Sequence, residues 1–108
     1  MKLIKAIIRQ EMLSQVIHEL SAIVPGMTVS EVLGHGRQRG YHTVYRGAEY
    51  NLTLPKTTVE IAIDDNKVDD VVKVLSETAR TGEIGDGRIV ISPIDESYHV
   101  RTGFMDLD

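Results

Sequence analysis

Residues 3–24 read LIKAIIRQEMLSQVIHELSAIV, and a related stretch returns at residues 58–79, TVEIAIDDNKVDDVVKVLSETA. Each copy opens with a short apolar or alternating run, which predicts a strand. Each then places apolar residues three and four positions apart, which predicts a helix with one apolar face. Aligned so that Ile4 meets Val59, the copies also pair Ile8 with Ile63 and Leu20 with Leu75. We interpret the chain as a doubled strand–helix–strand unit, and a chance match of two unrelated strand–helix pairs is the alternative.

Two further strands complete the predicted fold. Residues 27–33 alternate in polarity and follow Pro25-Gly26, which should end a first helix that runs from Met12 to Val24. Asp65-Asn66 can cap the second helix, which Thr81-Gly82 should end, and residues 88–92 form the last strand. Two strand–helix–strand units in tandem predict an α+β, ferredoxin-like β-α-β-β-α-β sandwich, an antiparallel sheet with two helices on one face.

Composition limits the classes of function. The chain has 108 residues and a mass of 12.0 kDa, which predicts a single domain over residues 1–108. Its net charge of −4 argues against a nucleic-acid partner, which would need a basic surface. It contains no cysteine, and its first residues are interrupted by charges too early for a signal peptide or a membrane span. We expect a cytoplasmic protein with no direct membrane insertion.

The first strand is apolar on both faces. Leu3 and Ile7 alternate with Ile4, Ala6 and Ile8, so one apolar row would face the helices and the other the open side of the sheet. An exposed apolar sheet face usually marks association between chains. We therefore expect a homo-oligomer.

Two glycine-rich segments indicate an anion site. Residues 34–40, GHGRQRG, begin a connection that reaches Lys56 without a sustained helical or strand period, and residues 81–88, TGEIGDGR, follow the second helix. Glycines beside arginines let backbone N–H groups and cations approach a phosphate. A Walker A loop, a catalytic triad and a metal-ligand spacing among the four histidines are absent from the sequence, so we expect binding without catalysis.

Four motifs resemble one family. Residues 45–50 (YRGAEY), 81–89 (TGEIGDGRI), 34–40 (GHGRQRG) and 100–103 (VRTG) look like those of the PII nitrogen-regulatory signal proteins. The resemblance implies a homotrimer that binds ATP or ADP in the clefts between subunits, and 2-oxoglutarate together with Mg²⁺ and ATP. It also implies a long T-loop between strands 2 and 3, here about Gln38 to Lys56.

The same resemblance assigns residues to ligands. Nucleotide binding would fall to Thr28, Gly34, Gly36, Arg37, Gln38, Gly85, Asp86, Gly87, Arg88 and Arg101. The 2-oxoglutarate site would use Arg9, Gln38 and Lys56, with Gln38 also holding Mg²⁺. Tyr50 stands at the family's position for nucleotidylation, and an unmodified contact tyrosine is the alternative.

The resemblance implies a non-enzymatic regulator that controls a target protein through the T-loop. That target would be an ammonium transporter, a glutamine-synthetase-regulating enzyme or a nitrogenase system. Three alternatives stay open: a small ferredoxin-like enzyme acting on a phosphate ester, an energy-charge sensor that does not respond to 2-oxoglutarate, and a structural trimer with a vestigial site. The departures that bear on these are His99 in place of an arginine, Val90 in place of an aromatic residue, Arg88 in place of a lysine and a T-loop shorter by one residue.

Overall fold

The computed structural model describes residues 1–35, 42–45, 48–51 and 53–106. Its strands are β1 (Lys2–Ile8), β2 (Thr28–His35), β3 (His42–Tyr45), β4 (Ala48–Asn51), β5 (Thr53–Ile63) and β6 (Gly87–Pro93). Its α-helices are α1 (Leu13–Leu20) and α2 (Val68–Ala79), each preceded by one short 3₁₀ turn, Gln10–Met12 or Asp65–Lys67. Among the described residues, none of the helices is long and apolar enough to cross a membrane.

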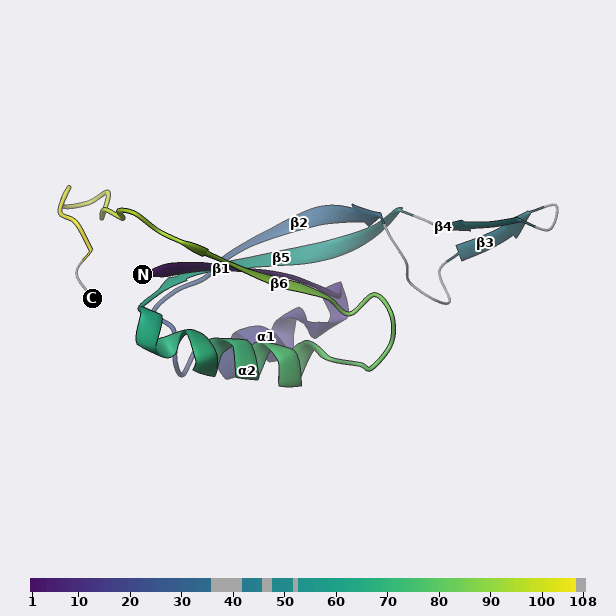
Figure 1. Cartoon of the computed structure of the whole chain (residues 1–108), viewed down its shortest axis with the longest axis horizontal. Coiled ribbons are helices and arrows are strands. Elements are labelled where there is room, and N and C mark those ends of the chain that lie inside the picture. Colours follow the sequence, from purple (N-terminus) through teal and green to yellow (C-terminus); the bar gives the residue numbers. More distant parts are fainter. Residues whose placement is uncertain (36–41, 46–47, 52, 107–108) are drawn as a thin grey trace.

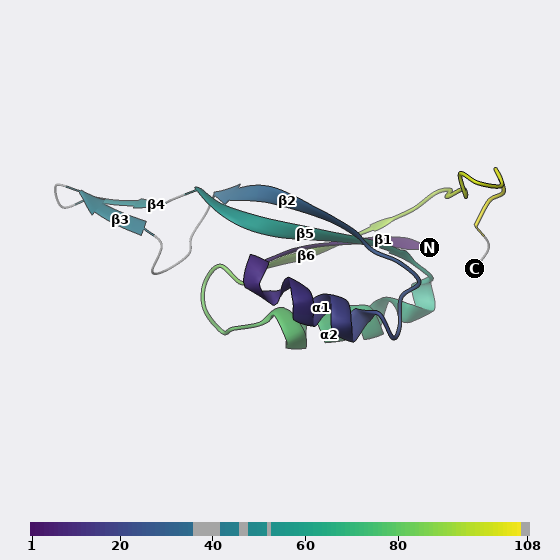
Figure 2. The same cartoon turned by 180° about the vertical axis from the view of Figure 1, so that it is seen from behind.

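Four of the strands form an antiparallel sheet in the order β2-β5-β1-β6. Both helices lie on one face of this sheet, and the opposite face is left open (Figures 1 and 2). Ile4 of β1 pairs with Ile61 of β5 on one side and with Ile91 of β6 on the other. The ferredoxin-like α+β arrangement expected from the repeat is therefore confirmed.

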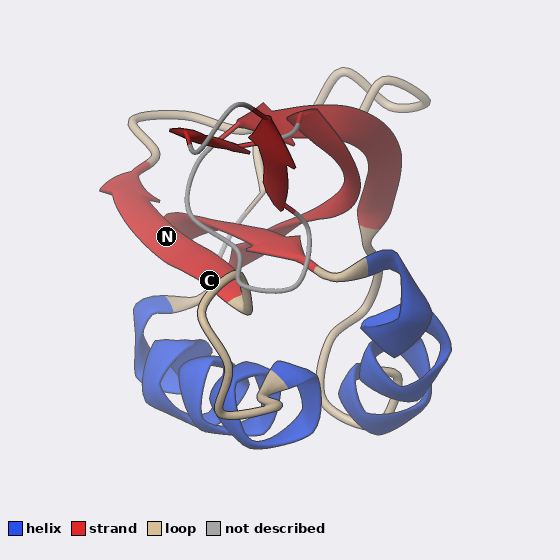
Figure 3. Ribbon diagram, turned by 90° about the vertical axis from the view of Figure 1, so that its right-hand side faces the viewer, coloured by secondary structure: helices blue, strands red, loops and turns tan. Residues whose placement is uncertain are grey.

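The core fills the layer between the sheet and the two helices, which Figure 3 shows end-on. Of the positions that the repeat aligned, Ile4, Val59, Leu20 and Leu75 are at most 1% exposed, and Ile8 and Ile63 are also buried. Burial of such side chains stabilises the fold by about 1.5–3 kcal/mol each. On the open face, Leu3 and Ile7 are only partly covered in the single chain, which agrees with the two-sided pattern of β1.

The first helix is shorter than predicted. It ends at Leu20, and the backbone N–H groups of Ile23 and Val24 both donate to the Leu20 carbonyl, at 2.9 and 3.0 Å. This tight turn still carries Val24 into the core. The spacing of Val24 from the apolar residues of the helix therefore looked like one more helical turn. The expected cap at Asp65-Asn66 was also wrong, since these residues begin the 3₁₀ turn and Asp65 pairs with the terminal amine of Met1 at 2.8 Å.

The connection from Gly34 to Lys56 contains more strand than predicted. β2 continues to His35 and β5 begins at Thr53, so that these two residues pair at the end of a long ladder. β3 and β4 form a separate two-stranded sheet that lies beyond this end (Figure 1). The side chains of these residues show no regular alternation, so the sequence pattern did not predict the strands. Pairing between strands nevertheless satisfies the backbone N–H and C=O groups of such residues.

Candidate functional site

The loop of residues 81–88 joins α2 to β6 and depends on its glycines. Gly82, Gly85 and Gly87 have φ values of 89°, 104° and 110°, a region that other residues rarely adopt. At Gly87 the backbone also touches the end of β1, because a Cβ there would lie 1.7 Å from the carbonyl oxygen of Ile7. The loop therefore lies closer to the end of β1 than it could if Gly87 carried a side chain.

The carboxylate of Asp86 lies at the centre of this loop. Its Oδ2 accepts the backbone N–H groups of Thr81 and Gly82, at 2.8 and 2.9 Å. Its Oδ1 accepts the Thr81 hydroxyl and Arg9 Nε, the latter at 3.0 Å. The Thr81 hydroxyl oxygen in turn accepts the N–H of Glu83 at 3.2 Å. The carboxylate thus ties both ends of the loop to the end of β1.

These donors set the ionisation of Asp86. Partial burial by itself would raise the pKa of the carboxyl, but the hydrogen bonds from the Thr81 hydroxyl, from Arg9 and from the two backbone N–H groups outweigh it. The pKa therefore lies well below the usual range of an aspartate. Asp86 is an anion at neutral pH.

This shift predicts a specific loss of stability in acid. Because the folded pKa lies below the unfolded value of about 3.9, Asp86 stabilises the fold above pH 4 and loses that contribution as the pH falls further. We expect urea unfolding to show the wild type more stable than Asp86→Asn at pH 7, with the difference shrinking between about pH 4 and pH 2. Glu77→Gln, an exposed change on α2, is the control. A constant difference at all pH values would contradict the assignment.

Two buried cations reach this loop from other strands. Arg9 follows β1, is 7% exposed, and donates through its terminal nitrogen to the carbonyl of Ile84 at 3.1 Å. Lys56 of β5 is 9% exposed and donates through Nζ to the carbonyl of Gly85 at 2.7 Å. Burial lowers the pKa of Lys56, as does the charge of Arg9, while Glu11 and Asp86 act in the opposite direction. Because the charge of Arg9 disfavours the charged form of Lys56, an anion bound beside both side chains would be stabilised.

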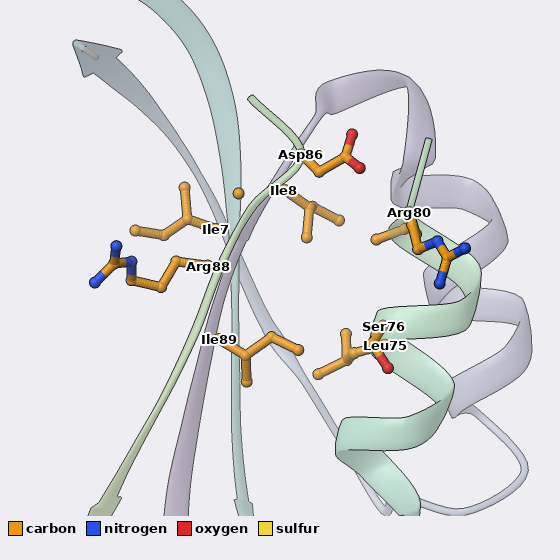
Figure 4. Close-up of a pocket in the computed structure, with 10 residues that line it drawn as sticks. Ile7, Ile8, Leu75, Ser76, Arg80, Asp86, Arg88 and Ile89 are labelled. Carbon is orange, nitrogen blue, oxygen red and sulfur yellow. The ribbon is translucent and has the colours of Figure 1, made fainter. Parts of the chain in front are cut away.

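Several residues that the resemblance assigned to ligands are brought together here. A Cβ at Gly34 would lie 3.0 Å from Cγ of Lys56, so β2 also reaches this end of the sheet. Arg88 pairs with Ile7, and Figure 4 shows both side chains on the side of the sheet away from Ile89 and α2. The group consists of Arg9, Gly34, Lys56, Gly85, Asp86, Gly87 and Arg88.

Other predicted residues lie elsewhere. Thr28, which begins β2, pairs with Glu60 near the middle of β5. Arg101 is exposed in the C-terminal segment, at the end of the molecule opposite the 81–88 loop (Figure 1). Gly36, Arg37 and Gln38 lie outside the described residues. Tyr50 belongs to β4 and pairs with Thr43 of β3. The structure does not describe its side chain.

The C-terminal segment that carries Arg101 is itself held together by polar contacts. Nε2 of His99 lies 2.6 Å from Oδ1 of Asp106, and the hydroxyl of Ser97 donates to Oδ2 of Asp106 at 2.5 Å. A β-bridge joins Tyr98 to Met105. His99, which the resemblance placed near the nucleotide, therefore also closes a small hairpin around Arg101.

A depression of about 260 Å³ lies on the helix side of β6 and shares Asp86, Gly87 and Arg88 with the group around Lys56. Ile8 and Ile89 form its sheet wall and Leu75 its helix wall, with Arg80 and Asp86 at the rim (Figure 4). Its lining is mostly apolar and does not include Lys56. We treat the cationic group around Lys56 as the candidate site, because that group can hold an anion.

Comparison with known proteins shows the family of this chain. The family model described as "Nitrogen regulatory protein P-II" matches residues 1–104. The chain belongs to the P-II family. It is 52% identical over 105 residues to the nitrogen regulatory protein P-II of Nostoc punctiforme, with 95% of this chain and 94% of the relative covered.

Two further P-II relatives extend the comparison. The nitrogen regulatory protein P-II of Synechocystis is 50% identical, with 100% of this chain and 98% of the relative covered. The nitrogen regulatory protein GlnK of Escherichia coli is 44% identical, with 98% and 96% covered. These proteins are named as regulators and not as enzymes, in agreement with the prediction of a non-enzymatic protein. The family thus places this chain in nitrogen regulation.

The sequence pattern did not reveal the part played by Thr81. The glycines and cations of residues 81–88 predicted an anion site, with no role for the hydroxyl that binds Asp86. The signal that was available is the spacing of threonine and aspartate across a glycine-rich turn, since short polar side chains commonly bond to nearby backbone in such turns. The partner Arg9 could not be found in this way, because it lies 77 positions away in the chain.

Proposed function

We propose that this P-II protein is a trimeric sensor that binds ATP or ADP between subunits and 2-oxoglutarate together with Mg²⁺ and ATP. The observation that carries the proposal is the buried pair Arg9 and Lys56, held beside the glycines of residues 81–88. Buried cations next to a glycine-rich turn suit a ligand with several negative charges. The sensor would act on a target protein through the segment between β2 and β5.

The distribution of the assigned residues supports a site between subunits. The 81–88 loop, which ends at Arg88 and contacts Lys56, lies at one end of the chain, and the C-terminal segment that carries Arg101 lies at the other (Figure 1). A single phosphate chain cannot contact both ends of one subunit, whereas a neighbouring subunit can bring its own Arg101 to the first end. The partly covered apolar residues Leu3 and Ile7 on the open sheet face would then be buried by association.

The two effectors would occupy adjacent positions. A triphosphate needs cations around its oxygens, for which Arg88 and a neighbour's Arg101 are available. A dicarboxylate beside it would be repelled unless a cation and a divalent ion lay between them, and Lys56 with Arg9 supplies positive charge at that place. Mg²⁺, when bound, would neutralise phosphate oxygens, with Gln38 as the protein group proposed to face it.

Regulation requires that ligands distinguish conformations of the segment between β2 and β5. Lys56 is well placed for this, because it stands on β5 at the base of that segment and contacts the 81–88 loop. A ligand that attracts the ammonium group would change this contact and bias the segment. The target would be an ammonium transporter, a glutamine-synthetase-regulating enzyme or a nitrogenase system.

Nucleotidylation would fall on Tyr50. Incubation with a nucleotidylating enzyme and labelled nucleotide should label the wild type and leave Tyr50→Phe unlabelled.

Calorimetric titration tests the proposal directly. We expect ATP with Mg²⁺ to bind, and 2-oxoglutarate to tighten that binding by the same factor by which ATP tightens 2-oxoglutarate. Light scattering on the same sample should report a trimer. ATP binding without any effect of 2-oxoglutarate would favour an energy-charge sensor of the same fold. No binding of either ligand at millimolar concentration would favour a structural trimer, and turnover of a phosphate ester would favour an enzyme.

A further inference from the structure

We infer that Asp86 is a positioning residue, held by Thr81, that fixes the 81–88 loop and Arg9 in the geometry needed to grip an anion, and that it is not itself a ligand. The inference rests on the proposed function for the identity of that anion. It assigns Thr81 to the site for the first time and changes the role that the resemblance gave to Asp86.

The acceptor capacity of the carboxylate supports this role. An ionised carboxylate has about four lone-pair positions on its two oxygens. Asp86 receives the Thr81 hydroxyl, Arg9 Nε and the backbone N–H groups of Thr81 and Gly82. These donors occupy the positions that a magnesium ion or a ribose hydroxyl would need, so direct coordination would require one of them to leave.

Charge leads to the same conclusion. A carboxylate that contacted a phosphate directly would repel it, whereas the same carboxylate behind the loop neutralises part of the charge of Arg9 and orients its guanidinium. The terminal nitrogen of Arg9 then reaches the carbonyl of Ile84. The carbonyl of the next residue, Gly85, receives Lys56 at 2.7 Å. Asp86 therefore holds Arg9 directly and fixes the loop whose Gly85 carbonyl receives Lys56.

The arrangement depends on the hydroxyl group of Thr81. Its side chain is exposed, so it contributes little burial, but its hydroxyl donates to Asp86 and accepts from Glu83 N–H. Thr81→Val keeps the shape of the side chain and removes both bonds. Thr81→Ser keeps the hydroxyl, and Asp86→Asn replaces one acceptor oxygen with a donor that faces other donors.

Amide hydrogen exchange and ATP titration on the full-length chain test the inference. In Asp86→Asn we expect exchange at the Thr81 and Gly82 amides to quicken about tenfold relative to amides of β1. With Mg²⁺ present, the Kd for ATP should rise about tenfold in Asp86→Asn and about fivefold in Thr81→Val, and stay within about twofold of wild type in Thr81→Ser. Val16→Ala, a buried change on α1, should quicken exchange generally and leave the Kd unchanged.

Two results would overturn the inference. One is unchanged relative exchange at Thr81 and Gly82 in Asp86→Asn, which would show that the carboxylate does not hold the loop. The other is a loss of ATP binding in Thr81→Ser as large as that in Thr81→Val, which would show that keeping the hydroxyl does not preserve the site. If the wild type binds no ATP, the proposed function fails, and the exchange measurement alone decides whether Asp86 positions the loop.

Discussion

Gly87→Ala is expected to destabilise the fold by about 3 kcal/mol or more and to abolish nucleotide binding. The added Cβ would lie 1.7 Å from the carbonyl oxygen of Ile7 and 2.8 Å from its carbon, and both are backbone atoms that cannot rotate away. The φ of 110° adds backbone strain. Relief requires β6 to separate from the end of β1, and this displaces Arg88, the next residue. Urea unfolding and ATP titration measure the two effects.

Two other glycines separate the contributions of contact and strain. Gly26→Ala introduces no contact within 4 Å and no positive φ, so its effect should lie within about 1 kcal/mol of zero. Gly82→Ala also meets open space but has a φ of 89°, and we expect a loss of about 1 kcal/mol from strain alone. Equal losses at Gly82 and Gly87 would contradict the close approach of β6 to Ile7.

Lys56→Ala is expected to weaken 2-oxoglutarate binding about 30-fold or more, while ATP binding changes by less than about fivefold. The ammonium group is a buried cation at the base of the segment between β2 and β5, and a carboxylate that binds there loses its principal partner when it is removed. ATP retains Arg88 and the glycines of residues 81–88. Titration of each ligand in the presence of a saturating concentration of the other gives the two values.

Controls separate charge from packing at this position. Lys56→Gln retains the Cβ and Cγ methylenes of the aliphatic stem and should lose 2-oxoglutarate to a similar extent, because the charge is what matters. Lys73→Ala, an exposed change on α2, should leave both affinities unchanged. An equal loss of ATP and 2-oxoglutarate in Lys56→Ala would show that the lysine supports the whole loop and does not select the dicarboxylate.

The doubled apolar pattern determined the fold. Ile4, Leu20, Val59 and Leu75 were placed by periodicity alone and are at most 1% exposed, because the side-chain periods of strand and helix are local properties of the backbone. Local chemistry also indicated the glycine-rich turn at residues 81–88. The pattern was misleading after Leu20, where the helix ends in a tight turn, because Val24 reaches the core from that turn as readily as from a helix.

Only the tertiary structure decided how the candidate site is assembled. Arg9 meets Asp86 across 77 positions of sequence and Lys56 meets Gly85 across 29, and both encounters depend on the antiparallel register that places the ends of β1, β5 and β6 side by side. Sequence spacing contains no information about such pairs, because hydrogen bonds and charge interactions depend on distance in space. The same long-range contacts turn Asp86 from an apparent ligand into the group that holds the loop.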